Sequence, residues 1–400
     1  MTVRPAGRGP VLVLHAGFVL AGMATTLLGP VLPVLAARWR LTDAAAGVLF
    51  TTQFLSATTL TVLSSWIANR LGPGRALATG YVLVAIGTAL LGVATHGLGL
   101  VATILYGGGL GLVLPLTNFV IAALRPQRAA SALSLVNVSW GVGAVLWPLI
   151  VRTLAEGESV RVATSALAAG AGVMAAVLWA VAAARAGLRR ERVAPVITTA
   201  AAGAASTPYR HAVLIGLVIF LYVGTETALG GWAAEFARRM AAATRDPGAS
   251  VWSYAPMAFW AAQTLGRLLA PLGLLAWGER RMLNASLATA AGAVAWLVFA
   301  ADTAVGVVVG AAAAGLGLAA IFPLVLAGAT RDIAPRLPGA MGPLFAAGGV
   351  GGAVIPWAVG IVSTGRGNLQ SGLFVALGAI GGMVVLTRVG RARAQSTSAA

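Results

Sequence analysis

The chain has 400 residues, of which 59% are hydrophobic and only 9% are charged, so it cannot build the water-facing surface of a soluble protein and is predicted to be a membrane protein. It contains no cysteine and only three scattered histidines, which excludes disulfides, cysteine nucleophiles and thiolate metal sites and leaves no metal-ligand spacing. The net charge of +17 is spread over the short gaps between apolar runs, which excludes a single basic face for nucleic acid.

Twelve apolar stretches follow one another along the chain, and each is close to the length of about 20 residues that a helix needs to cross a bilayer. The first is preceded by Arg4 and Arg8, as in a signal peptide, but its length and the many spans behind it favour a membrane helix. The predicted fold class is an all-α membrane protein with twelve transmembrane helices, at 10–37, 45–68, 76–95, 98–123, 129–154, 161–184, 211–236, 251–276, 282–300, 303–329, 339–363 and 369–388.

A polar stretch, Gly187 to Tyr209, separates the sixth span from the seventh. It begins with a cluster of arginines, continues with Ala, Thr, Ser and Pro, and has no apolar periodicity, which is typical of a linker. We therefore expect an N-terminal six-helix bundle at 1–186, a cytoplasmic linker at 187–209, and a C-terminal six-helix bundle with a short cytoplasmic tail at 210–400.

The second half of the chain repeats the first in its hydrophobic pattern and in the short motifs that interrupt the apolar runs. Four features recur in the same order: the run GLGL at 109–112 and 315–318, the run GVGAVLWP at 141–148 with GVGGAVIP at 349–356, the lone glutamines Gln53 and Gln263, and the short loops Leu71-Gly72 and Trp277-Gly278. Two six-helix bundles related by a parallel repeat are the architecture of a transporter that rocks one half against the other.

The arginines indicate how the chain is oriented. An even number of spans leaves both termini on one side of the membrane, and 18 of the 27 basic residues fall on that side, against eight on the opposite side and one inside a span. Basic residues near membrane helices prefer the cytoplasmic face. We expect a multi-pass protein of the cell inner or plasma membrane with both termini in the cytoplasm.

Glu226 lies in the middle of the seventh span, roughly 22 Å from its cytoplasmic start. An acid at this depth costs on the order of 3 kcal/mol, so it must be protonated, paired or exposed to a water-filled cavity. Because burial favours the neutral acid, Glu226 is the candidate proton-coupling residue. The alternative is a static ion pair with Arg267, the arginine inside the eighth span. Gly230, one turn from Glu226, leaves an open approach to it.

Several other polar and aromatic side chains lie inside the spans and are candidates for solute binding. Amides and indoles are suited to a sugar, because hydroxyls need paired donors and acceptors while pyranose faces stack on aromatic rings. Each amide could equally serve as a hydrogen bond between helices. The candidate substrate-binding residues around a polar central pocket are Gln53, Asn118, Asn137, Trp140, Tyr222, Trp260, Gln263 and Arg267.

A group of charges follows Trp232 at the outer end of the seventh span. It consists of Glu235, Arg238 and Arg239. We interpret Trp232 as an interfacial indole and the three charged residues as a solvated cluster, with no role in binding.

The loop after the second span, SSWIANRLGPGR at Ser64–Arg75, is similar to the signature loop of the major facilitator superfamily, and the duplicated twelve-helix plan resembles that superfamily over essentially the whole chain. The resemblance implies a gating loop made of Asn69, Arg70, Gly72 and Arg75. The usual pattern has an aspartate before the basic residue, where this chain has Asn69.

Three further segments resemble the fucose and glucose permease branch of that superfamily: Asn118, the run Asn137–Pro148, and YVGTETALGGW at Tyr222–Trp232 with its Glu, Gly-Gly pair and Trp. The resemblance implies a sugar as the solute. Proton-coupled members of the branch also carry an acid four residues before the Asn of the fourth helix, where this chain has Leu114.

The leading functional hypothesis is a secondary active transporter that moves a small hydroxylated solute, with a sugar as first candidate, by alternating access and with protons as the coupling ion. The alternative is an exporter of drug-like or metabolic amphipathic compounds, which the Ala- and Leu-rich spans and the absence of acids from the first and fourth spans favour. An enzyme is not expected, because no HExxH motif, paired carboxylates in a span or cysteine is present. The expected partners are the solute, the lipid bilayer and protons; we expect a monomer without cofactor or metal.

Overall fold

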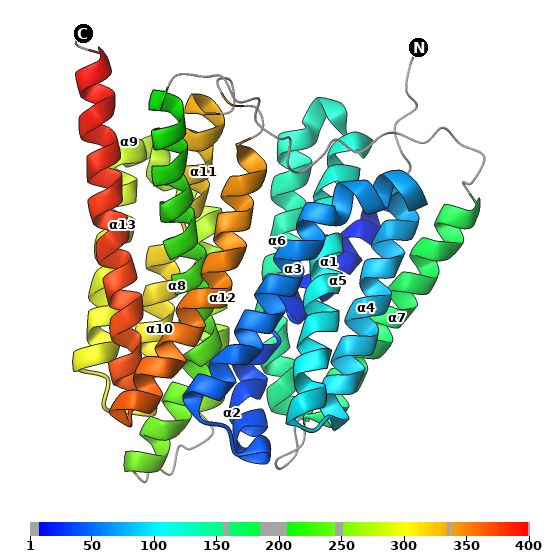
Figure 1. Ribbon diagram of the computed structural model, residues 1–400, viewed down its shortest axis with the longest axis horizontal. Helices are drawn as coiled ribbons and strands as arrows, with labels where there is room; N and C mark the ends of the chain where they lie inside the picture. Colours follow the sequence, from blue (N-terminus) through cyan, green and yellow to red (C-terminus); the bar gives the residue numbers. More distant parts are fainter. Residues whose placement is uncertain are drawn as a thin grey trace. The chain divides into compact units, whose positions relative to one another are not determined.

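The computed structural model describes residues 8–154, 160–184, 206–244, 251–333, 337 and 340–398, and every regular element among them is a helix. The first half of the chain forms α1 Arg8–Thr25, α2 Leu28–Trp39, α3 Asp43–Leu71, α4 Pro73–Val93, α5 His96–Leu124, the 3₁₀ turn η1 Pro126–Arg128, α6 Ala129–Leu154 and α7 Arg161–Ala184. The second half forms α8 Ser206–Thr244, the 3₁₀ turn η2 Val251–Tyr254, α9 Ala255–Phe299, α10 Ala304–Leu318, α11 Ile321–Asp332, α12 Met341–Arg366 and α13 Leu369–Ser398 (Figure 1). The predicted all-α class is confirmed.

Within the described ranges, eleven helical stretches are long and apolar enough to cross a membrane. One of them, Val251–Phe299, contains both the eighth and the ninth predicted spans, because α9 is continued through a sharp bend at Gly278. Gly278 has φ 71° and ψ 165°, a backbone conformation that glycine adopts without a steric penalty. The twelve predicted spans are therefore all present, two of them in one bent helix.

The first and tenth spans are each broken in the middle, although the sequence pattern predicts one continuous helix for each. The first is interrupted at Thr26–Leu27, between α1 and α2, and the tenth at Ala319–Ala320, between α10 and α11. Pro30 and Pro323 explain both breaks: a proline ring clashes with the carbonyl four residues earlier and offers it no N–H. Those carbonyls belong to Thr26 and Ala319.

By the contacts between its residues, the chain divides into two compact units. Unit 1 comprises Met1–Val34 and Thr52–Val196, and unit 2 comprises Leu35–Thr51 and Ile197–Ala400. The first nine residues of α3 therefore belong to unit 2, although the helix continues into unit 1. Residues 187–205 of the predicted linker lie outside the described residues, and residues 206–209 begin α8. The predicted domain boundaries stay a prediction.

The same glycine-mediated helix crossing holds each unit together. In unit 1, a Cβ on Gly143 of α6 would lie 1.9 Å from the carbonyl oxygen of Val19 on α1. In unit 2, a Cβ on Gly351 of α12 would lie 2.0 Å from the carbonyl oxygen of Phe220 on α8, which runs beside α12 in Figure 1. Small residues let membrane helices approach closely enough for dispersion forces to hold them. The repeated GVG run thus marks equivalent contacts in the two units.

The two GLGL runs make equivalent contacts in the two units only when the second run is shifted by two residues relative to the first. Gly109 meets the backbone of Gly80 on α4, the third span, and its counterpart is Gly317, which meets Ala290 in the ninth span. Gly315 packs instead against the carbonyl of Phe259. The offset between the two halves is thus 317 − 109 = 208 at this motif, as it is for the GVG runs.

We predict that Gly351→Ala destabilises the protein by about 1–3 kcal/mol, the usual cost of overpacking, because the new methyl group would overlap the Phe220 carbonyl. The matched control is Gly378→Ala on α13, where nothing lies within 4 Å of the added Cβ. The apparent melting temperature, followed as loss of the monodisperse peak on size exclusion, should fall for the first variant only. Equal melting temperatures would contradict the close crossing of α8 and α12.

Candidate functional site

Four of the predicted site residues of unit 2 form one polar cluster. Tyr222 and Glu226 lie one turn apart on α8, and Gln263 and Arg267 lie one turn apart on α9. Arg267 Nη2 lies 2.7 Å from Glu226 Oε1, and the Tyr222 hydroxyl donates to the same oxygen at 2.8 Å. Gln263 Nε2 also donates to Glu226 Oε1. Three donors from two helices therefore converge on a single carboxylate oxygen.

The direct ion pair between Glu226 and Arg267, which the sequence leaves open, is formed. It lowers the cost of a charge at this depth, because a cation and two neutral donors replace water around the carboxylate. The pair is not fully buried, because the side chain of Glu226 is 13% exposed and that of Arg267 is 32% exposed. Glu226 Oε2 accepts no hydrogen bond from the described residues, so an accessible acceptor remains beside a partly exposed guanidinium.

Aromatic rings pack around this cluster. Tyr222 stacks on Phe322 of α11 with ring centroids 5.5 Å apart, and Trp260 makes an edge contact with Phe259 at 4.9 Å. A Cβ on Gly230 would lie 2.8 Å from the indole of Trp260. The expected open approach at Gly230 is therefore wrong, because the Trp260 ring fills that space.

In unit 1, Gln53 and Trp140 both bind to Thr25. Thr25 is the last residue of α1, so the helix gives its carbonyl no internal partner. Gln53 Nε2 donates to this carbonyl at 3.0 Å, while Gln53 Oε1 accepts from the Tyr106 hydroxyl at 3.0 Å. Trp140 Nε1 donates to Thr25 Oγ1 at 3.3 Å. The buried Gln53 thus links α1, α3 and α5, which supports its reading as an interhelical hydrogen bond.

Asn118 of α5 and Asn137 of α6 form a second polar contact in unit 1. Asn137 Nδ2 donates to Asn118 Oδ1 at 3.3 Å, and each amide also bonds to the carbonyl four residues earlier in its own helix, that of Leu114 or Leu133. Asn118 is half-buried and Asn137 is exposed in the structure. Unlike Gln53, this pair keeps amide surface that a solute could reach.

The predicted gating loop is the tight turn between α3 and α4. Gly72 has φ 86° and is followed by Pro73 at the first position of α4, so a residue with a side chain would be strained at this point. The guanidinium of Arg70 lies 4.5 Å from the ring centroid of Trp66. Gly278 adopts nearly the same conformation in the matching turn of unit 2. The gating role of Asn69, Arg70, Gly72 and Arg75 stays a prediction.

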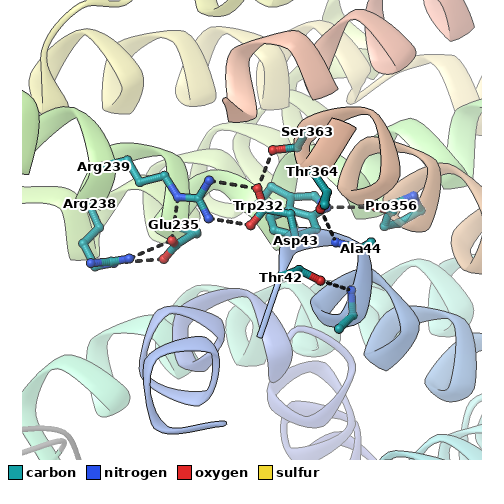
Figure 2. Close-up of polar contacts among 11 residues, drawn as sticks. Thr42, Asp43, Ala44, Trp232, Glu235, Arg238, Arg239, Pro356, Ser363 and Thr364 are labelled. Atoms are coloured by element: carbon teal, nitrogen blue, oxygen red, sulfur yellow. Dashed lines mark hydrogen bonds and ion pairs between the residues drawn. The ribbon is translucent and has the colours of Figure 1, made fainter. Parts of the chain in front are cut away.

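The interpretation of Trp232 and Glu235, near the predicted outer end of the seventh span, as an interfacial indole and a solvated acid is wrong. Trp232 is 1% exposed, and its indole N–H donates to the carbonyl of Pro356 at 3.1 Å. The side chain of Glu235 is 2% exposed and accepts from both Arg238 and Arg239 (Figure 2). Charges at positions i, i+3 and i+4 of a helix are the signal that could have shown this group to be a built network.

Sequence reasoning also missed Thr25 and Tyr106. Pro30 was the available signal for Thr25, because a proline that ends a helix one turn earlier leaves the last carbonyls of that helix without internal partners. Tyr106 has no local signal, since only the packing of α5 on α3 brings it to Gln53. Among the residues that the structure describes, no three His, Asp or Glu side chains could together hold a metal ion.

The sequence model of the Major Facilitator Superfamily matches residues 14–271, well over half of the chain. The chain belongs to the Major Facilitator Superfamily. It is thus a membrane transporter and not an enzyme, and the predicted fold of that superfamily is confirmed. No curated protein sequence matches the chain.

Solved structures of this superfamily share the fold at low sequence identity. The nucleoside transporter NupG is 15% identical, with a TM-score of 0.72 over 96% of this chain and 98% of its own. A bacterial homologue of the human lysosomal transporter Spinster is 15% identical, with a TM-score of 0.74 over 98% of each chain. A variant of the E. coli fucose:proton symporter FucP is 18% identical, with a TM-score of 0.61 over 95% of this chain and 98% of its own.

We predict that Arg267→Met lowers the free energy of unfolding by about 2 kcal/mol or more, because it leaves the Glu226 carboxylate without its cation. The double variant Arg267→Met/Glu226→Gln removes the charge as well and should recover most of that loss. The two apparent melting temperatures in detergent decide the matter. A double variant as unstable as the single one would show that Arg267 acts through packing alone.

Proposed function

We propose that this transporter moves a small hydroxylated solute, with a sugar as first candidate, by alternating access coupled to protons. The observation that carries the proposal is the cluster around Glu226 Oε1, which places a carboxylate, a guanidinium, an amide and a phenol together inside a membrane span. Intramembrane charges of this kind mark substrate or ion pathways more often than they stabilise a fold.

The chemistry of the cluster supports a neutral, hydroxylated solute. Its one anion and one cation balance, so a solute with net charge would leave one of them uncompensated. A hydroxyl group both donates and accepts, and can therefore donate to Glu226 Oε2 while accepting from the partly exposed guanidinium of Arg267. FucP, the xylose transporter XylE and NupG, which share the fold, are named for fucose, xylose and nucleosides, all of them hydroxylated.

The ion pair supports the proposed proton coupling. When Glu226 binds a proton it loses its charge, and its hold on Arg267 weakens from an ion pair to a neutral hydrogen bond. The Arg267 guanidinium can then donate a hydrogen bond to a solute hydroxyl as well. When the proton leaves, the pair re-forms and competes with the solute. Loading of the proton and the solute would therefore favour each other.

We assign supporting roles to the other predicted residues. Asn118 and Asn137 are proposed to bind solute hydroxyls, since their amides keep exposed surface. Trp140 and Trp260 are proposed to supply stacking faces. Gln53 is proposed to hold the broken first span in shape through its bonds to Thr25 and Tyr106.

Uptake into proteoliposomes tests the coupling role of Glu226. A thermal-shift screen over fucose, xylose, uridine and amphipathic cations first selects the solute used. We expect an inward proton gradient to drive accumulation by the wild type, and Glu226→Gln to catalyse exchange of the solute without gradient-driven accumulation. Glu279→Gln, in the exposed pair with Arg331, is the control and should behave as wild type. Gradient-driven accumulation by Glu226→Gln would reject the coupling role.

The same screen separates the two transport hypotheses. Stabilisation by amphipathic cations and by none of the hydroxylated compounds would favour an exporter of drug-like compounds, because hydroxylated solutes would then have no site.

We further propose that the protein is monomeric in the inner or plasma membrane, with both termini in the cytoplasm. The chain has no cysteine, so single cysteines report topology without background. Cysteines at Thr2 or Ser398 should resist a membrane-impermeant maleimide in intact cells and react after permeabilisation. Ala243→Cys, at the exposed outer end of α8, should react in intact cells. Labelling of either terminus in intact cells would overturn this orientation.

A further inference from the structure

A cavity of about 290 Å³ lies within unit 2, and no residue of the Glu226 cluster lines it. It is found where α8 begins, α9 bends and α11 ends, which is the upper end of these helices in Figure 1. The proposed orientation places this end on the cytoplasmic side of the membrane. The volume is near the lower end of the range for ligand pockets, ~300–1,000 Å³. The cavity can therefore hold part of a larger molecule.

Most of the wall of this cavity is apolar. Leu214 and Val218 lie one turn apart on α8, and Leu324 faces them from α11. Leu283, beyond the bend of α9, and Leu386 of α13 complete the wall. A small hydrated ion would lose water against these side chains and gain no partner from them. The occupant that fits this wall must therefore carry an apolar part.

Gly328 of α11 leaves room for such a part. It shares a helix face with Leu324 and Arg331, at spacings of four and three residues. No described atom lies within 4 Å of the point where a Cβ on Gly328 would stand. Unlike Gly351, this glycine makes no close helix crossing with the described residues. A larger side chain at position 328 would instead occupy the cavity.

The polar part of the lining contains an arginine that has no partner. Glu279 accepts two hydrogen bonds of 3.1 Å from Arg331, and Asp332 Oδ1 lies 3.5 Å from Arg331 Nε. Both acids are therefore already bound to one arginine. Arg280 also lines the cavity, is exposed, and forms no hydrogen bond or ion pair with any residue that the structure describes. Its guanidinium is thus available to an external anion.

Three more cations adjoin the lining. Each is exposed and is the chain neighbour of a residue that lines the cavity: Arg210, Arg281 and Arg388. Five arginines and two acids therefore surround this end of unit 2, and the excess of positive charge favours an anionic occupant. Basic clusters at the cytoplasmic ends of membrane helices attract anionic lipid head groups. An apolar wall beside such a cluster matches a molecule with an anionic head and an apolar tail.

We propose that this cavity binds an anionic phospholipid of the surrounding membrane, with its phosphate on Arg280 and the first carbons of its acyl chains against Leu214, Leu324 and Leu386. A guanidinium presents a planar set of donors that matches the oxygens of a phosphate. The site goes beyond the proposed function, since it lies apart from the Glu226 cluster and takes a ligand that is not transported.

Thermal shift of the purified full chain in neutral detergent tests this site. The probes are dioctanoyl phosphatidylglycerol, dioctanoyl phosphatidylcholine, which has the same chains without net charge, and glycerol phosphate, which has the phosphate without the chains. We expect a saturable rise in melting temperature with phosphatidylglycerol alone. An equal rise with phosphatidylcholine would show that no anion is needed. An equal rise with glycerol phosphate would show a site for a soluble anion. Either result would overturn the proposal.

Two variants locate the lipid in the cavity. Arg280→Gln should weaken the apparent affinity for phosphatidylglycerol about tenfold, as expected from the loss of one charge-assisted hydrogen bond. Gly328→Leu fills the cavity without changing any charge and should abolish the shift. The matched controls are Gly328→Ala, which adds one methyl group in open space, and Arg366→Gln, which removes an exposed arginine at the end of α12. Both should keep the wild-type affinity within a factor of about two.

Unchanged affinity in Arg280→Gln would show that the phosphate is bound elsewhere, and unchanged affinity in Gly328→Leu would show that the lipid stays outside the cavity. An equal loss in Arg366→Gln would reveal a general attraction to basic surface. Each of these results rejects the site. Arg280→Gln replaces an exposed side chain and needs no repacking, so it decides the matter even if Gly328→Leu does not fold. The measurement uses no solute or gradient, so absence of sugar transport would leave its result standing.

Discussion

The scarcity of water inside a bilayer is the constraint on which this structure depends. The ion pair between Glu226 and Arg267 shows the effect of this constraint most clearly. A carboxylate in the middle of a span is tolerated only where protein groups replace its hydration. Here three donors from α8 and α9 bind one oxygen of Glu226 and leave the other oxygen accessible. The arrangement that makes the charge tolerable is also what would let a proton or a hydroxyl group act on it.

The same constraint governs the broken spans. Pro30 and Pro323 interrupt the first and tenth spans, and a broken helix exposes carbonyls that lipid cannot satisfy. In unit 1, the carbonyl groups of Thr25 and Leu27, which flank the break, accept from the side chains of Gln53 and Trp147. Polar and aromatic side chains at such breaks therefore bond first to the exposed backbone carbonyls. Only side chains with further donors or acceptors can also bind a solute.

The two units share a backbone plan and differ in chemistry. Gly143 and Gly351 make equivalent close crossings, so the duplication is real in space. Gln53 and Gln263 also recur, but Gln53 bonds to a carbonyl and a tyrosine, while Gln263 bonds to a carboxylate that also holds an arginine. The bonds of Gln53 thus involve neutral groups, whereas those of Gln263 involve an ion pair. In this duplicated scaffold the packing glycines recur at matching positions, while the partners of the matching glutamines differ.

The sequence alone predicted the membrane class, the twelve spans and the parallel repeat. It also predicted that Tyr222 lies on the same helix face as Glu226, and Gln263 on the same face as Arg267. Both kinds of prediction were possible because hydropathy and the spacing of three or four residues are local properties of a helix. Only the tertiary structure decided that Arg267 reaches Glu226, that Trp232 and Glu235 are buried, and that Asp43 binds Arg239 across 196 residues. The reason is physical: a side chain's depth follows from its own span, but its partners depend on how far each neighbouring helix has rotated and slid, which packing alone sets.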